Sequence, residues 1–233
     1  LGGNGTGKTT TLNVISGLNK AYRGKVLING KPIREYKGNS LYRGKLAFLP
    51  QNPQTVFIKD TVRGDFADIL QAVETPKKII AEKINKAAEK IGVSGLLDKH
   101  PYDLSGGEQQ KCALAKMLLL EPEILLMDEP TKGLDSYYKH TLKNLLSELR
   151  CDGITILMVT HDVEFAAENA DRCALFFDGE ILSADRPEKF FGENNFYTTA
   201  ANRMARGLWK SAVTCDQVTE YCLAERRKKL CIQ

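Results

Sequence analysis

This sequence has no apolar run long enough to cross a bilayer, and its charges are nearly balanced. Its 33 basic and 29 acidic residues leave a net charge of +4, which does not by itself indicate a nucleic-acid-binding protein. Its six cysteines show no CxxC pair or other metal-ligand spacing, so we predict free thiols in a reducing cytoplasm. With 42% hydrophobic and 27% charged residues, the composition is that of an ordinary globular chain.

The glycine-rich stretch from Gly2 to Thr9 fits the pattern G-x-x-x-x-G-K-[ST] of a phosphate-binding loop. Its glycines let consecutive backbone N–H groups point toward phosphate oxygens, and the apolar run that follows predicts a helix whose positive N-terminus faces the anion. Lys8 would bring charge to the β- and γ-phosphates, and the Thr9 hydroxyl would ligate Mg²⁺. Taken alone, the stretch also fits an ordinary glycine-rich turn. The candidate nucleotide-binding residues of the loop are Gly2, Gly3, Asn4, Gly5, Thr6, Gly7, Lys8, Thr9 and Thr10.

The sequence also lacks a starting methionine, because it begins at Leu1 and enters this loop at once. A phosphate-binding loop normally follows a buried strand, and no strand precedes Leu1 in this sequence. We therefore expect the sequence to be a segment of a longer chain.

Two carboxylates end the most apolar stretch of the chain. The run from Ile124 to Met127 is continuous, as a parallel strand buried on both faces requires, and Asp128 and Glu129 follow it. Ligands bind at the carboxyl ends of such strands, so we expect Asp128 to face the Mg²⁺ beside Thr9. A surface turn starting at Asp128 is the alternative, and the position at the strand end argues against it.

Gln51 and His161 follow two further predicted strands, at residues 45–50 and 154–159. An amide such as Gln51 at a strand end could ligate a metal or hold a water molecule, although a lone Gln is more often a plain loop residue. A lone His is usually structural or solvated, but His161 lies at a predicted strand end, as Asp128 does.

Helical spacing of apolar residues predicts a helical lobe from Asp60 to Gly92, with a break at Pro76. A further helix, predicted at 108–120, opens at Ser105-Gly106-Gly107, which is a second potential anion site or simply a helix capped by Ser105. A strand pair is predicted around Asp178-Gly179, and the alternation of strands and helices gives an α/β fold.

Taken in order, these motifs resemble those of the ATP-binding cassette (ABC) ATPases, over about residues 1–190. The matching stretches are the loop at 2–9, Gln51, the signature stretch at 104–110, Asp128-Glu129, Asp135 and His161. The resemblance implies a P-loop NTPase fold with a parallel sheet core, a helical signature subdomain inserted at about 60–118, and a C-terminal helical extension over 191–233. It also implies that the phosphate-loop strand belongs between the strands that end at His161 and near Asp178, so we expect an open sheet edge there.

The resemblance implies ATP and Mg²⁺ as cofactors and a role for each matching residue. Glu129 would be the general base that activates water, and His161 would contact the γ-phosphate. The implied catalytic residues are Glu129, His161 and Gln51, and the implied metal site is formed by Thr9, Gln51 and Asp128. Ser105, Gly106 and Gly107 would serve the nucleotide of a second cassette in a head-to-tail dimer.

A narrower resemblance is to the ATPases of energy-coupling-factor importers. It depends on the stretches at 51–54, 104–111, 129–135 and 196–203, and Glu108 stands where other branches have Gln. It implies the second cassette of a fused tandem pair, peripheral on the cytoplasmic face of the membrane. Such a cassette powers uptake of a vitamin, a vitamin precursor or a metal ion through integral membrane subunits, without nucleic acid.

Two other functions are alternatives to this one. A soluble ABC-family ATPase of translation or DNA repair usually carries long coiled coils or a basic linker between cassettes, and this sequence shows neither. A catalytically dead scaffold would have lost Lys8, Glu129 or His161, and all three are present.

The loop after Gln51 is the predicted contact with the membrane subunits, because Val56, Phe57 and Ile58 are apolar residues between polar ones. Alternatively, Val56 and Phe57 are buried beneath the helical lobe as part of its core.

Overall fold

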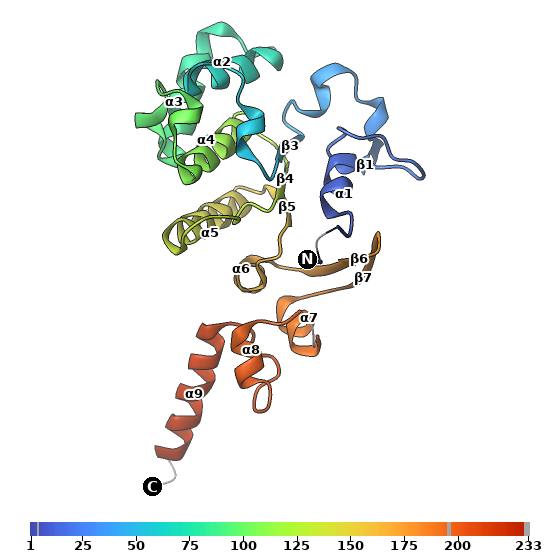
Figure 1. Cartoon of the computed structure of the whole chain (residues 1–233), viewed down its shortest axis with the longest axis vertical. Coiled ribbons are helices and arrows are strands. Elements are labelled where there is room, and N and C mark those ends of the chain that lie inside the picture. The colour runs from blue at the N-terminus through green and yellow to red at the C-terminus, as the bar shows by residue number, and fades with distance from the viewer. Residues whose placement is uncertain (4, 195–196, 231–233) are drawn as a thin grey trace. The chain divides into compact units, whose positions relative to one another are not determined.

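The computed structural model describes residues 1–3, 5–194 and 197–230, and it separates the chain into two compact units. One unit comprises Leu1–Lys8 and Thr160–Gln233, and the other comprises Thr9–Val159. Figure 1 shows both units, each of which is described by itself below. Within the described ranges, the helices are either too short or too polar to cross a membrane.

The Thr9–Val159 unit is built on a three-stranded parallel sheet in the order β3 (Leu46–Leu49), β4 (Ile124–Asp128) and β5 (Thr155–Val159). The central strand β4 is buried after its first residue, which confirms the predicted strand covered on both faces. In the part of the chain that the structure describes, β5 pairs only with β4 and is partly exposed, in agreement with the expected open edge.

Helices cover this sheet on two sides. Figure 1 shows α1 (Lys8–Ile15) and α5 (Ser136–Cys151) on opposite sides of β3–β5. The α1 side is closed by a core cluster that joins the helix to both β3 and β4; its buried members are Leu12, Ile28, Leu41, Leu46 and Leu126. Burial of this apolar surface fixes the start of α1, and with it Thr9, against the sheet.

A short hairpin of β1 (Leu27–Ile28) and β2 (Lys31–Pro32) follows α1. Asn29 and Gly30 form its turn with φ angles of 51° and 77°, and positive φ at both positions is what the tight hairpin turn demands. The Asn-Gly pair had predicted this turn.

The predicted helical lobe at 60–92 consists of α2 (Val62–Ala72) and α3 (Lys77–Ile91), and α4 (Gly106–Leu118), which the implied subdomain at about 60–118 includes, packs against both. The three helices cluster together in Figure 1 and bury Phe66, Leu70, Ile84 and Ala88 among them. Thr61 caps α2 by accepting a hydrogen bond from the Gly64 N–H. The lobe is thus a packed body of its own, beside the sheet that carries the strand-end residues.

The other unit contains the antiparallel pair β6 (Cys173–Phe177) and β7 (Glu180–Asp185), followed by helices. These helices are α6 (Val163–Asn169), α7 (Pro187–Glu193), α8 (Ala200–Ala205) and α9 (Cys215–Leu230). The edge-to-face pair Phe190 and Phe191, with ring centroids 4.9 Å apart, forms its core with Cys173 and Val213.

The first residue of the chain belongs to this second core. The Leu1 amino group donates to the Ala174 carbonyl at 2.8 Å, and the Phe176 N–H donates to the Leu1 carbonyl at 2.7 Å. This is the bonding pattern of parallel strands, with Leu1 opposite Leu175. The backbone therefore enters the phosphate loop directly from a position beside β6.

Candidate functional site

The phosphate loop is curled as its glycines predict. Gly2, Gly5 and Gly7 have φ angles of 153°, 77° and 97°, and L side chains rarely adopt such angles. A Cβ atom built on Gly2 would lie only 2.2 Å from the Phe176 carbonyl oxygen. Contact with β6 thus requires glycine at position 2. The candidate residue Asn4 lies outside the described residues.

Lys8 points into the curl of its own loop. Its side chain is buried, and the Nζ atom donates to the carbonyl oxygens of Gly2, at 2.9 Å, and Gly3. The Thr6 hydroxyl donates to the same Gly3 carbonyl at 2.9 Å. The ammonium group is therefore already placed within the loop, where a phosphate oxygen would replace the carbonyls as its partner. Thr9 and Thr10 are exposed in the first turn of α1.

Strand register places Gln51 and Asp128 at the same edge of the sheet. Leu49 of β3 pairs with Met127 of β4, so Asp128 lies one residue, and Gln51 two residues, beyond that paired position. Asp128 is 1% exposed and Glu129 is 8% exposed. The register thus places the buried Asp128 and the exposed Gln51 just after the carboxyl ends of neighbouring parallel strands.

Glu129 has an unusual backbone. Its φ angle is 48°, in the left-handed region that non-glycine residues rarely adopt, and its N–H donates to the Val159 carbonyl at 2.8 Å. Such a conformation costs of order 1–3 kcal/mol and persists where the surrounding structure imposes it, often at functional sites. The bend turns the chain out of the sheet immediately after Asp128.

The Asp128 carboxylate is a hard oxygen donor of the kind that Mg²⁺ prefers. The described residues contain no group of three or more His, Cys, Asp or Glu side chains that could hold a metal ion. Mg²⁺ is usually bound by one or two carboxylates together with waters and substrate phosphates. The buried Asp128 carboxylate matches the carboxylate part of that pattern.

The signature stretch forms a capping box at the start of α4. The Ser105 hydroxyl accepts from the Glu108 N–H at 3.4 Å, and Glu108 Oε2 accepts from the Ser105 N–H at 2.9 Å and from its hydroxyl at 2.7 Å. These bonds to the carboxylate hold the pKa of Glu108 below its usual range. The cap by Ser105 was predicted, whereas the return bond from Glu108 was missed although the S-x-x-E spacing signals it.

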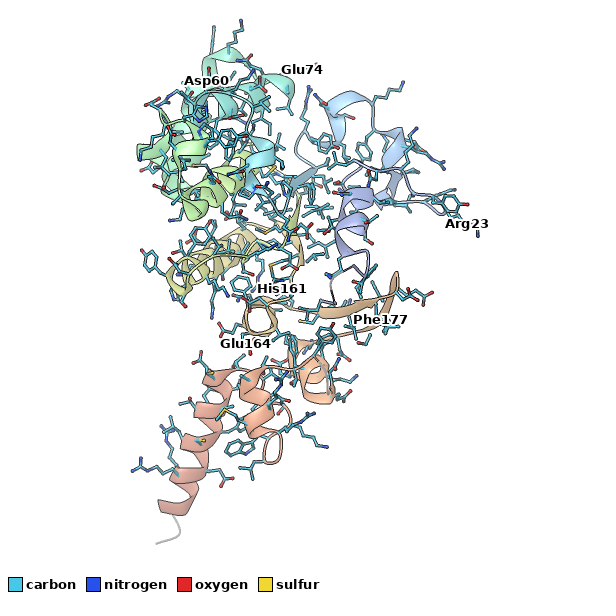
Figure 2. All side chains as sticks on the ribbon, in the orientation of Figure 1. Arg23, Asp60, Glu74, His161, Glu164 and Phe177 are labelled. Carbon is cyan, nitrogen blue, oxygen red and sulfur yellow. The ribbon has the colours of Figure 1, made fainter. Side chains whose placement is uncertain are left out.

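His161 is exposed and lies just before α6, as Figure 2 shows. The next residue, Asp162, caps that helix by accepting from the Phe165 N–H at 3.0 Å. The motifs do not predict one neighbour of the phosphate loop: a Cβ built on Gly3 would lie 3.6 Å from the Tyr197 hydroxyl oxygen. Nothing local in the sequence relates Tyr197 to a loop almost two hundred residues earlier.

Comparison with known proteins gives a consistent set of matches. Residues 1–132 match the family model described as "ABC transporter". A putative ABC transporter ATP-binding protein of Bacillus anthracis is 41% identical over 226 residues, which are 95% of this chain and 40% of that protein. The energy-coupling factor transporter ATP-binding protein EcfA of Methanocaldococcus jannaschii is 34% identical over 88% of this chain and 74% of its own length. The chain thus spans less than half the length of the Bacillus relative.

Two solved structures share the fold. The cbiO1 protein of Clostridium perfringens, described as part of the ABC transporter complex cbiONQ, has a TM-score of 0.73 and 30% identity, with 83% of this chain and 78% of that one covered. A dimeric ATP-binding cassette in a post-hydrolysis state, bound to ADP and Pi, has a TM-score of 0.71 and 27% identity, with coverages of 80% and 83%.

Proposed function

The chain belongs to the ABC transporter family of ATPases, and from this premise we propose that it binds and hydrolyses ATP to power an importer of the energy-coupling-factor type. One observation carries the ATPase proposal: the buried pair Asp128 and Glu129 ends the central strand, beside Gln51. A buried carboxylate next to a metal-binding carboxylate is suited to accept a proton from water at a phosphate.

The phosphate loop supplies ATP binding in this proposal. Its N–H groups and the Lys8 ammonium would hold the β- and γ-phosphates, with Lys8 exchanging the Gly2 and Gly3 carbonyls for phosphate oxygens. Thr9, Asp128 and Gln51 would hold Mg²⁺, which neutralises charge on the phosphates when bound.

Glu129 would act as general base, with Gln51 orienting the water and His161 contacting the γ-phosphate. The burial of Glu129 and its strained backbone conformation support this role, because strained residues often lie at functional sites. Ser105, Gly106 and Gly107 would complete the nucleotide site of a second cassette, and Ser105 and Gly106 are exposed for that contact.

Substitution of Glu129 by Gln in the complete polypeptide tests the ATPase mechanism. Glu129→Gln keeps the shape and removes the base, so we expect ATP binding to persist while turnover falls by about 10²–10⁴-fold. Lys8→Ala should instead weaken ATP binding, which separates the two roles. ATP affinity is measured with a fluorescent nucleotide, and turnover by phosphate release. Near-normal turnover of Glu129→Gln would show that Glu129 is not the base.

The importer type is supported by similarity to proteins named as energy-coupling factor ATP-binding proteins. Under this proposal the chain is a peripheral cassette on the cytoplasmic face of the membrane. It pairs with a second cassette and drives uptake of a vitamin, a vitamin precursor or a metal ion through separate membrane subunits.

The docking surface predicted after Gln51 requires a correction. Phe57 is only 5% exposed and belongs to the core, while Ile58 is exposed and Val56 is half-buried. A groove of about 390 Å³ is lined on one side by the loop and α2, with Thr55, Val56, Ile69, Ala72 and Val73. The rest of its lining comes from the segments after α1, from β3 and from the end of α4. We therefore assign docking of the membrane subunits to this groove and not to the Phe57 side chain.

A further inference from the structure

We propose that the buried ion pair of Asp65 and Lys116 is a clamp that positions the loop after Gln51 against the signature helix α4, and that ATP turnover depends on this clamp. Asp65 lies on α2 and Lys116 lies on α4, and the Lys116 Nζ atom is 2.7 Å from Asp65 Oδ1. Their side chains are 0% and 6% exposed. The inference rests on the proposed ATPase function and assigns two positioning residues to it.

The remaining bonds of the pair go to the backbone of the loop. Asp65 accepts from the Ile58 N–H at 3.0 Å and from the Lys59 N–H at 3.3 Å. Lys116 donates to the Val56 carbonyl, and its Nζ lies 5.9 Å from the centroid of the Phe57 ring. Four consecutive residues are therefore held by one pair of charges.

The energetics of buried charges indicate that this pair positions the loop backbone and does not simply stabilise the fold. A buried ion pair pays a large desolvation cost, and apolar residues of similar volume often replace it without loss of stability. Leu and Met could join α2 to α4, but they could not accept the Ile58 and Lys59 N–H groups or donate to the Val56 carbonyl. The charges therefore serve the loop backbone more than the contact between helices.

The pair also connects the segment after Gln51 to the helix that begins at the signature stretch. Lys116 lies on the helix that Ser105 caps, and the clamped segment begins five residues after Gln51. A change at Gln51 when the phosphate site changes state would thus reach the signature helix through the clamp. If the pair were lost, the segment from Val56 to Lys59 would lose the bonds that join it to α2 and α4.

The test uses the apolar double variant Asp65→Leu/Lys116→Met in the complete polypeptide. We expect the double variant to fold with a lower melting temperature, because three backbone groups of the loop lose their partners, and to keep its ATP affinity. Its kcat should fall by about 10²-fold, the loss that a misplacement of about 1 Å can cause. Lys116→Arg keeps charge and donors and should retain most of the turnover. The control is Arg63→Met. This change removes the exposed ion pair between Arg63 on α2 and Asp98, which lies outside the clamp, so kcat should stay unchanged.

Wild-type kcat in a folded double variant would overturn the clamp and leave the pair purely structural. Should the double variant not fold, amide hydrogen exchange in the wild type decides: slow exchange at Ile58 and Lys59, as in the α4 core, supports the clamp, and fast exchange at both overturns it. A wild-type protein without ATPase activity would overturn the proposed function instead, and the exchange measurement would still judge the clamp.

Discussion

At the scale of single residues, Gly2 shows how closely the phosphate loop depends on β6. We expect Gly2→Ala to unfold the loop or prevent ATP binding, because its Cβ would overlap the Phe176 carbonyl oxygen in addition to the strained φ angle. The control is Gly5→Ala, where the described neighbours leave open space and only backbone strain of about 1–2 kcal/mol applies. Chemical denaturation and nucleotide titration measure both variants. Equal losses for the two would contradict the steric argument.

Phe57 and Tyr197 mark the limit of residue-scale prediction from sequence. The sequence left open whether Phe57 is core or docking surface, and long-range packing against Lys116 makes it core. The neighbourhood of Tyr197 and Gly3 likewise arises from packing between segments far apart in the chain. In contrast, glycine permits the positive φ angles of Gly2, Gly5 and Gly7, so the sequence anticipates where the loop can curl.

At the scale of elements, the capping box of α4 predicts a pH-dependent contribution to stability. Because hydrogen bonds to Ser105 lower the folded-state pKa of Glu108 from the usual 4.5, the stabilisation is present above that unfolded value. It is lost as the pH falls through the lower folded pKa. We therefore expect Glu108→Ala to destabilise the protein at pH 7 and to differ less from wild type in acid.

Thermal unfolding of wild type and Glu108→Ala between pH 7 and pH 3 measures this difference. Ser105→Ala should cost about 1 kcal/mol at pH 7, as loss of a helix cap usually does. A Glu108→Ala effect that grows as the pH falls would contradict the assigned role of the carboxylate.

The groove beside α2 is the element on which the importer proposal can be tested. Ala72 is exposed and lines the groove, so Ala72→Glu should leave folding and basal ATPase activity intact while reducing assembly with the membrane subunits and transport. The neighbouring Gln71 is exposed and does not line the groove, which makes Gln71→Glu the matched control. Pull-down with the membrane subunits and a solute-uptake assay measure the effect.

Phe57→Asp is expected to behave differently, because it introduces a charge into the core beside Lys116 and should destabilise the protein itself. A well-folded Phe57→Asp protein, or an Ala72→Glu protein with normal transport, would place the docking surface elsewhere.

At the scale of the whole molecule, the order of elements was largely predictable because strands and helices leave local patterns. The apolar run before Asp128 forms the central strand, and the Asn29-Gly30 and Asp178-Gly179 pairs form turns as predicted. The α/β P-loop fold and the family are confirmed. The sequence could not give the Asp65–Lys116 pair, because contacts between residues 51 positions apart leave no local signal. The roles of the candidate site residues stay predictions.

The last prediction concerns assembly. If Ser105 serves the nucleotide of a second cassette, a cysteine at Ser105 should crosslink to a cysteine at Thr6 of the partner's phosphate loop in the presence of ATP. Ser105 is exposed and therefore accessible for such a contact. The Glu129→Gln background should raise the yield, since the bound ATP would persist.

The native thiols set the design of this experiment. Cys151, Cys215 and Cys222 are exposed and must be replaced by Ser, as must Cys231, which lies outside the described residues. Burial raises the pKa of Cys112 to about 12 and that of Cys173 to about 11, so both stay protonated near pH 8 and do not compete for the crosslinker. A cysteine at Glu74, on the exposed turn after α2, replaces the one at Ser105 as the control. Crosslinking through Ser105 is compared with ATP, with ADP and in the Lys8→Ala variant. If the ATP molecule is shared between the two cassettes, the crosslinking yield should depend on the γ-phosphate. Equal yields in all three cases would reject an ATP-dependent head-to-tail dimer.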